Sequence, residues 1–189
     1  MIPFHTISYY TYKTMHVLTD KELYVAIEYA RNIDEENGRK VMETFQAEQP
    51  ALAQTIFNIF PSLIGQQNQE MANMFMELSF DTLCVYQHAF GHAPTQTEEW
   101  LERQTALLDT ELQALIPDNP MNPKIREKLQ TRFSERAFNE VTQMRLIEVM
   151  NDSIDDYASE STSRVPFIKF TQTMIFTVIR LFSNLYSQP

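Results

Sequence analysis

The stretch VPFIKFTQTMIFTVIRLF, residues 165–182, decides the fold class because its apolar side chains recur with a helical period. On a helix of about 100° per residue, Lys169 and Arg180 fall together on one half of the circumference. An apolar arc fills the other half, and it contains Phe167, Ile168, Phe170, Met174, Ile175, Val178, Leu181, Phe182 and Leu185. Since so wide an arc is typical of a helix that is surrounded by others, we predict a core helix from about Pro166 to Tyr186.

This stretch is not expected to enter a membrane. Lys169, Gln172 and Arg180 interrupt it, and no stretch of the chain reaches the roughly 18 uninterrupted apolar residues of a membrane span. Its few basic residues also make it a poor match to a helix that lies on a lipid surface. The N-terminus, MIPFHTISYYTYK, lacks the features of a signal peptide, and the single cysteine, Cys84, cannot form an intrachain disulfide. The sequence therefore predicts a soluble, cytoplasmic protein.

Glycine usage favours helices over the whole chain. Only three glycines occur among 189 residues, at positions 38, 65 and 91, far below the average of about 7%. Turn-rich β architectures need many glycines for their positive φ angles. The length also fits one domain, since domains commonly hold about 100–200 residues. We therefore predict an all-α fold, a single bundle-like domain of about six or seven helices.

Local signals predict where the first helices begin and end. Thr19 and Glu22 match a capping box at the start of a helix, and Gly38 is expected to end or break that helix. Pro50 can open the next one, which Pro61 should bend or end because proline lacks an amide donor. A long helix is predicted from about residue 67 to residue 90, with Gly91 as its stop signal.

The remaining segments complete the predicted domain organisation. Residues 1–18 show no helical period and are predicted to form an extended N-terminal arm, and residues 19–189 form the single helical domain. A fifth helix is expected near 95–116. The proline-rich loop 117–122 is a possible subdivision, and the longest helix should follow it from Asn122 to Tyr157, with Ile125 and Met144 among its inward residues. SESTSR, residues 159–164, is then a polar hinge.

Charge restricts the class of partner. The net charge of −10 and the pI near 4.8 argue against nucleic-acid binding, which needs a basic footprint. Residues 51–122 hold nine acids against Arg103 alone, whereas residues 164–189 hold three bases and no acid. One interpretation is that the last segment packs against an acidic body. The alternative is that the acidic middle of the chain recruits a basic partner.

Several chemistries are excluded by missing motifs. The three isolated glycines allow neither a Gly-rich phosphate loop nor a Gly-x-Ser-x-Gly nucleophile elbow. The zinc-protease pattern His-Glu-x-x-His fails because alanine follows both His88 and His92. Helical di-iron proteins place Glu three residues before a ligating His, but the four histidines here have other residues there: Ile2, Lys13, Val85 and Ala89.

ELSFDTLCVYQHAFGH, residues 77–92, contains the first candidate site. Glu77, Asp81, Cys84 and His88 follow one another at spacings of four, three and four, and share one arc of the predicted helix. An amphipathic helix produces this spacing without a metal, so we predict a solvated face. The alternative is a zinc site, given the nitrogen, oxygen and sulfur donors. Cys84 is not expected to be a nucleophile, because Asp81 should raise its pKa.

The second candidate is the acidic cluster Glu148, Asp152, Asp155 and Asp156. Helix-borne carboxylates can hold magnesium for phosphate chemistry, although charge runs are usually solvated faces. Acids at a helix C-terminus also oppose the macrodipole. We expect Arg164 or Lys169 to compensate for them, with a bound cation or a basic partner as the alternative.

The absence of catalytic motifs and the acidic middle segment favour one class of function. We predict a non-catalytic acidic helical protein that acts through protein–protein interaction, as an adaptor, regulator or immunity-type inhibitor. Two alternatives stay open: a divalent-metal-dependent enzyme that uses helix-borne carboxylates, with Zn or Mg as its ion, and a helical protein that binds an apolar ligand. Ten methionines and thirteen phenylalanines suggest the latter. A homo-oligomer is also compatible with the sequence.

Overall fold

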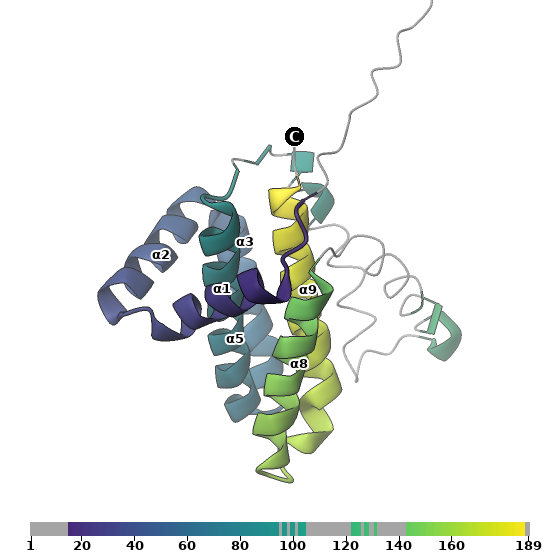
Figure 1. Cartoon of the computed structure of the whole chain (residues 1–189). Coiled ribbons are helices and arrows are strands. Elements are labelled where there is room, and N and C mark those ends of the chain that lie inside the picture. The colour runs from purple at the N-terminus through teal and green to yellow at the C-terminus, as the bar shows by residue number, and fades with distance from the viewer. Residues whose placement is uncertain are drawn as a thin grey trace, which may run out of the picture.

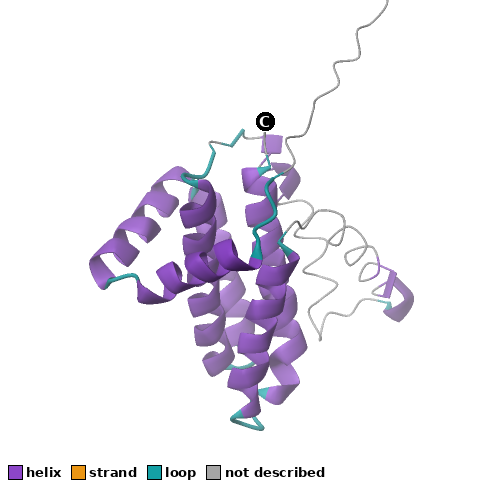
Figure 2. Ribbon diagram, in the orientation of Figure 1, coloured by secondary structure: helices purple, strands orange, loops and turns teal. Residues whose placement is uncertain are grey.

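The computed structural model describes residues 15–94, 96–97, 99–100, 102–104, 122–125, 127–128, 131 and 143–187, and these form helices and loops without a strand (Figures 1 and 2). The prediction of an all-α fold is confirmed. In chain order the elements are α1 (Asp20–Asn32), α2 (Glu35–Glu48), α3 (Pro50–Gln54), a π-helical turn η1 (Thr55–Ile59), α4 (Phe60–Gly65), α5 (Gln69–Phe90), α8 (Met144–Ser159), a 3₁₀ turn η2 (Val165–Phe167) and α9 (Ile168–Tyr186).

Three long helices make the body of the bundle. In Figure 1, α5, α8 and α9 run alongside one another, and α1 lies across α5. The α3–η1–α4 run packs against α5 from another side. The predicted core helix is confirmed as α9. Of its predicted apolar arc, six residues are at most 1% exposed, and these are Met174, Ile175, Val178, Leu181, Phe182 and Leu185. The other three, Phe167, Ile168 and Phe170, are half-buried, whereas Ile179 beside the arc is also fully buried.

Aromatic rings join α9 to its neighbours. The Phe182 ring centroid lies 5.5 Å from that of Phe45 on α2 and 5.3 Å from that of Tyr86 on α5. The buried Tyr86 hydroxyl lies 2.7 Å from the Ser183 Oγ and donates to the Ile179 carbonyl oxygen at 3.2 Å. Since a buried hydroxyl without a partner would cost stability, these bonds let the core enclose a tyrosine.

The outer half of α9 differs from the prediction. Lys169 is exposed as expected, but Arg180 is only 2% exposed. All residues from 177 to 183 are buried, so this part of α9 is enclosed on every side. Periodicity alone could not show this, because it reports the polarity of a face and not whether the rest of the chain covers it.

The segment Val165–Tyr186 is long and apolar enough to cross a membrane by length and composition, because it contains a window of 18 residues with a mean hydropathy of 1.3. Half of this window is buried inside the bundle, and the core helix of a soluble protein meets the same two criteria. The expectation that it stays out of a membrane therefore remains a prediction.

Helix boundaries follow local chemistry in most places. The capping box is confirmed: the Glu22 amide donates to the Thr19 Oγ1 at 3.3 Å, and the Thr19 amide donates to Glu22 Oε2 at 2.8 Å. Gly91 ends α5 with a φ of 83°, in the left-handed region that favours glycine. The prediction for Gly38 is wrong, because this residue lies inside α2. A Cβ at Gly38 would lie 3.3 Å from Phe80 Cζ, so glycine lets α2 approach α5.

Pro61 does not end its helix. The helical run continues through it from residue 50 to residue 65. The π turn η1 lies immediately before Pro61, and in it the Phe60 amide donates to the Thr55 carbonyl oxygen five residues back. We attribute this wider turn to Pro61, which has no amide to donate and whose ring crowds the preceding carbonyl in a regular α-helix.

The predicted helix from Asn122 to Tyr157 is interrupted. Gln143 adopts φ −104° and ψ 60°, and α8 begins only at the next residue, Met144. Met144 is 38% exposed and Ile125 54% exposed, so neither is an inward residue as predicted. The apolar period continues through residue 143 in the sequence, but the helix does not, so the prediction wrongly extended one helix across this break.

The Gln143 side chain explains the interruption. It is 2% exposed. Its Oε1 accepts from the Leu18 amide at 3.1 Å, and its Nε2 donates to the His16 carbonyl oxygen at 2.8 Å. This carboxamide ties the segment before α1 to the start of α8.

Residues 1–14 of the predicted arm lie outside the described residues, as do most of the predicted helix 95–116 and all but Asn122 of the loop 117–122.

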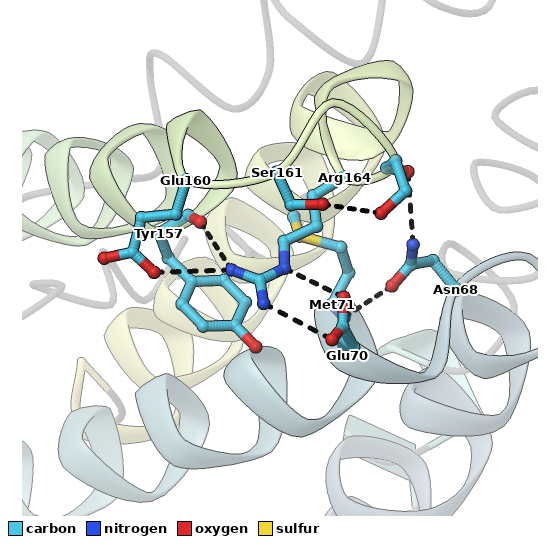
Figure 3. Close-up of polar contacts among 8 residues, drawn as sticks. Asn68, Glu70, Met71, Tyr157, Glu160, Ser161 and Arg164 are labelled. Carbon is cyan, nitrogen blue, oxygen red and sulfur yellow. Dashed lines mark hydrogen bonds and ion pairs between the residues drawn. The ribbon is translucent and has the colours of Figure 1, made fainter.

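Arg164 closes the polar hinge between α8 and α9 (Figure 3). Its Nη1 donates to the Tyr157 carbonyl oxygen at 2.9 Å, and its guanidinium lies 4.0 Å from the centroid of the Tyr157 ring. Its Nε and Nη2 donate to the two carboxylate oxygens of Glu70 at 2.9 and 3.3 Å. Arg164 thus joins the last turn of α8 to the first turn of α5. Its partners are Tyr157, Glu70 and Glu160 rather than the acidic cluster of α8, so the expectation that it compensates those acids is not confirmed.

Replacement of Arg164 should destabilise the bundle in a pH-dependent way. Arg164→Ala is expected to lower the midpoint of thermal unfolding at pH 7. Arg164→Lys should lower this midpoint by a smaller amount, because an ammonium group keeps the charge but cannot form the bidentate pair with Glu70. Arg164 holds the pKa of Glu70 below its ordinary 4.5. A lowered folded-state pKa stabilises above the ordinary value, and this contribution is lost as pH falls through the lowered one. The difference between wild type and variant should therefore shrink in acid; an unchanged difference at pH 3 would contradict this.

Candidate functional site

The first candidate set lies on α5, and its four members do not share one environment. Glu77 and His88 are exposed, as a solvated face requires. The Asp81 side chain is 17% exposed, and Cys84 is fully buried. The prediction of a solvated face is therefore wrong for Cys84 and only partly right for Asp81.

The packing of α1 explains these differences. The Tyr29 ring of α1 stacks on His88 with centroids 4.6 Å apart, and Arg31 Nε lies 3.7 Å from Asp81 Oδ2. Cys84 lies one turn from each of these contacted residues, so α1 crosses α5 above it. The buried face of α1 includes two small side chains, Ala26 and Ala30.

Burial makes Cys84 a poor nucleophile. It raises the pKa of the Cys84 thiol to about 12, and the negative charge of Asp81 adds to the effect. Because the thiolate is the reactive form, the side chain stays protonated and inert at neutral pH. The sequence correctly indicated the influence of Asp81, although burial is the larger cause.

The candidate metal ligands are not brought together. Glu77 and Asp81 line one groove, and His88 lines another on the other side of the α1 crossing. Across residues 15–94, 143–187 and the short described pieces between them, no group of three or more His, Cys, Asp or Glu side chains is placed to hold a metal ion.

The second candidate set forms an exposed face of α8. Glu148, Asp152, Asp155 and Asp156 are all exposed, and the opposite side of the helix is buried. Arg145 forms an ion pair with Glu148, and the Gln172 Nε2 donates to Asp155 at 2.9 Å. These contacts to protein groups are typical of a solvated charged face.

Glu77 and Asp81 lie together in one groove, and we call it the acidic groove. It has a volume of about 480 Å³ between α1, α5 and α8. Its lining has an apolar part and a polar part. The apolar residues are Ala30, Ile33, Met74, Leu78 and Phe80, and the polar ones are Arg31, Glu77, Asp81 and Ser153.

Asp81 is the electrostatic centre of the acidic groove. Burial raises its pKa, the Arg31 guanidinium partly offsets this, and the Glu77 carboxylate raises it further. The Arg31 contact is long at 3.7 Å, Arg31 is itself 48% exposed, and its Nη2 also donates to the Ser153 Oγ at 3.4 Å. The Asp81 carboxylate is therefore desolvated but incompletely compensated.

Asp81→Asn should stabilise the protein at neutral pH. Since the folded-state pKa of Asp81 is raised above its ordinary 3.8, wild type loses stability as pH rises from that value through the raised pKa. The variant has no such loss, so it should unfold at higher denaturant concentration at pH 7 and match wild type near pH 3. Glu43→Gln, on the exposed side of α2, serves as the control. A variant less stable than wild type at pH 7 would show that Arg31 already compensates Asp81.

A second groove of about 530 Å³ lies between the segment before α1, α1 itself and the end of α5. In it, His16 Nε2 lies 3.0 Å from Glu22 Oε2. The pKa of Glu22 is lowered to about 2, mainly by the Thr19 amide and hydroxyl and then by His16. This carboxylate is thus already compensated within the capping box, which makes the groove a weaker candidate for a charged ligand.

The sequence did not indicate Arg31 and Ser153 as site residues. Each lies on a helix far from Glu77 and Asp81 in the chain, and only the packing of α1 and α8 on α5 brings them together.

No protein-family model, no curated protein and no solved structure matches the chain.

Proposed function

We propose that this chain is a non-catalytic acidic helical protein that binds a basic segment of another protein in the acidic groove. By binding this partner, the chain would act as an adaptor, a regulator or an immunity-type inhibitor. The observation that carries the proposal is Asp81, a largely buried carboxylate whose pKa is raised because burial outweighs its long contact with Arg31. A cation from a partner would supply the missing compensation.

The lining of the acidic groove fits a lysine or arginine side chain. These side chains have a methylene stem that packs on apolar surface and a charged head that remains among polar groups. Met74, Leu78 and Phe80 offer the apolar surface, and Glu77 and Asp81 offer carboxylates beside it. An uncharged apolar ligand would remove more water from those carboxylates without supplying a positive charge, which is unfavourable.

The charge around the acidic groove supports the same class of partner. The chain carries a net charge of −10, and the exposed acids of α8 flank Ser153 at positions 152 and 156. Complementary charge accelerates association and selects the partner. Binding should therefore weaken with rising salt.

The test compares partner binding by variants of matched charge. The native protein is purified with whatever accompanies it, and the partner is identified by mass spectrometry. The double variant Glu77→Gln, Asp81→Asn should lose a stoichiometric protein partner that wild type retains. The control, Glu35→Gln, Glu43→Gln on α2, has the same net charge and two exposed positions outside the groove, and should retain it.

Two outcomes would contradict the proposal. If both double variants keep the partner equally, the acidic groove is not its site. If wild type instead carries near-stoichiometric metal, or a small molecule and no protein, the metal-dependent enzyme or the apolar-ligand protein becomes the better hypothesis.

A further inference from the structure

The acidic groove and the second groove lie on opposite sides of α1, which crosses α5 between them (Figure 1). On α5, the lining of the acidic groove ends at Asp81, and that of the second groove begins at His88. These residues are seven positions apart. Since a helix rises about 1.5 Å per residue, the grooves lie about 10 Å apart along α5. A bound segment can therefore reach from one groove to the other within a few residues.

The exposed side of α1 connects the two grooves through an apolar row. Val25 lines the second groove, Ile33 lines the acidic groove, and Tyr29 lies four residues from each. Residues four apart are neighbours on a helix surface. Val25 and Tyr29 are both exposed, and tyrosine is enriched where proteins meet. A segment that crosses α1 therefore has side chains on which to pack along its path.

The second groove leaves open a charge of the opposite sign to that of the acidic groove. Its carboxylate, Glu22, already accepts from the Thr19 amide and hydroxyl and pairs with His16, so it has little to offer a cation and little with which to repel an anion. Lys21 forms no ion pair among the described residues. His88 lines the same groove, and an imidazole can donate an N–H to a carboxylate. The groove can therefore receive an acidic side chain.

The position of Lys21 in α1 needs a reason outside the helix. Lys21 lies in the first turn, between Asp20 and Glu22. The N-terminus of a helix carries a partial positive charge, which favours these two acids and opposes a base. Residues that break such a local rule are expected at functional sites. A contact with another molecule would account for a lysine at this position.

We propose that the partner segment which occupies the acidic groove continues across Tyr29 and places an acidic side chain in the second groove, against Lys21 and His88. This inference rests on the proposed function, because it concerns the same partner. It adds that the segment carries a base and an acid at a defined spacing. An extended chain advances about 3.3 Å per residue, and alternate side chains point to the same side. An acid four positions from the base spans about 13 Å, enough for the distance between the grooves and the path over α1.

The two grooves together would select the partner more sharply than the acidic groove alone. A net charge of −10 attracts any basic segment, but a segment with bases at both positions would set a like charge against Lys21. Opposite charges at two places fix both the choice of partner and its register. Lys21 and His88 are exposed, and exposed ion pairs are weak, so the acid should improve affinity by only roughly two- to fivefold.

Selection of random peptides displayed on phage, with the full chain as bait, tests the proposal. Peptides selected on wild type should combine a lysine or arginine with an aspartate or glutamate about four positions away. Peptides selected on the double variant Lys21→Gln, His88→Gln should keep the base and lose the preference for the acid. The control, Lys40→Gln, His92→Gln, makes the same two replacements at exposed positions outside both grooves and should select the wild-type pattern.

A synthetic peptide of the selected sequence then measures the contact by fluorescence anisotropy. Replacement of its acid by the corresponding amide should weaken binding to wild type by roughly two- to fivefold. The same replacement should leave binding to Lys21→Gln, His88→Gln unchanged. This comparison is a double-mutant cycle, so it separates the pair from other effects of each change. Circular dichroism of each variant confirms that the exposed substitutions leave the fold intact.

The failure of this inference differs from the failure of the proposed function. If wild type selects basic peptides without a preference for an acid, or if Lys21→Gln, His88→Gln keeps that preference, the inference is overturned and the proposed function stands. If wild type selects no basic peptides, or the same peptides as Glu77→Gln, Asp81→Asn, the acidic groove does not bind a base. The proposed function then fails, and this inference fails with it.

Discussion

Deletion of residues 165–189 is expected to abolish cooperative unfolding. The deleted segment contains α9, in which seven large apolar side chains between Met174 and Leu185 are at most 1% exposed. Each large apolar side chain contributes about 1.5–3 kcal/mol through burial, whereas the net stability of a domain is only about 5–15 kcal/mol. Because α9 carries seven such side chains, and its removal also strips the buried faces of α5 and α8, the remainder should not hold a native core.

Thermal melts followed by far-UV circular dichroism measure this result. The truncated chain should lose its sigmoidal transition and show reduced helical signal at every temperature. Lys169→Ala, an exposed position on the same helix, is the control and should melt like wild type. A truncated chain that melts sharply at the wild-type temperature would show that α9 is a peripheral tail.

Phe182→Ala is expected to lower the free energy of unfolding by about 3–5 kcal/mol. Phe182 is 1% exposed, and its ring lies against the rings of Phe45 and Tyr86, which belong to two other helices. The substitution removes apolar contact and leaves a cavity that three helices must close together. Since their positions are fixed by other contacts, the cavity should collapse only in part.

Chemical denaturation at pH 7 provides the measurement for Phe182. Phe182→Leu keeps most of the side-chain volume and should cost less than Phe182→Ala. Tyr24→Ala removes an aromatic ring that is 65% exposed, and it should change stability by no more than about 0.5 kcal/mol. Equal effects of Phe182→Ala and Tyr24→Ala would contradict the assignment of Phe182 to the core.

The features predicted correctly are those that depend on residues near one another in the chain. The capping box at Thr19 needs only its own first turn, and Gly91 ends α5 because its positive φ suits glycine. The core role of α9 follows from an apolar arc too wide for a surface helix.

The errors arise where distant segments decide the environment. Cys84 shares a face with exposed residues, yet α1 covers it, and no local pattern shows that α1 crosses α5 at this position. Gly38 suggests a helix end from sequence, but its contact is Phe80 on α5. Gln143 interrupts a periodic stretch because its side chain binds the backbone at His16 and Leu18. The acidic groove was missed for the same reason, since three helices contribute to it.

The central claim is that a basic segment of a partner occupies the acidic groove, and site-specific cross-linking tests it most directly. Ser153→Cys places a reactive thiol on the rim of the groove. The native Cys84 should not interfere, because it is fully buried and its pKa is raised to about 12. A benzophenone maleimide is attached at position 153 or, as the control, through Glu43→Cys on α2. The labelled proteins are then irradiated with the co-purified partner.

A cross-link from position 153 to a partner peptide that contains lysine or arginine, without a comparable product from position 43, is the result that we predict. A bound partner that is cross-linked equally from both positions, or from position 43 alone, would contradict the claim that it occupies the acidic groove.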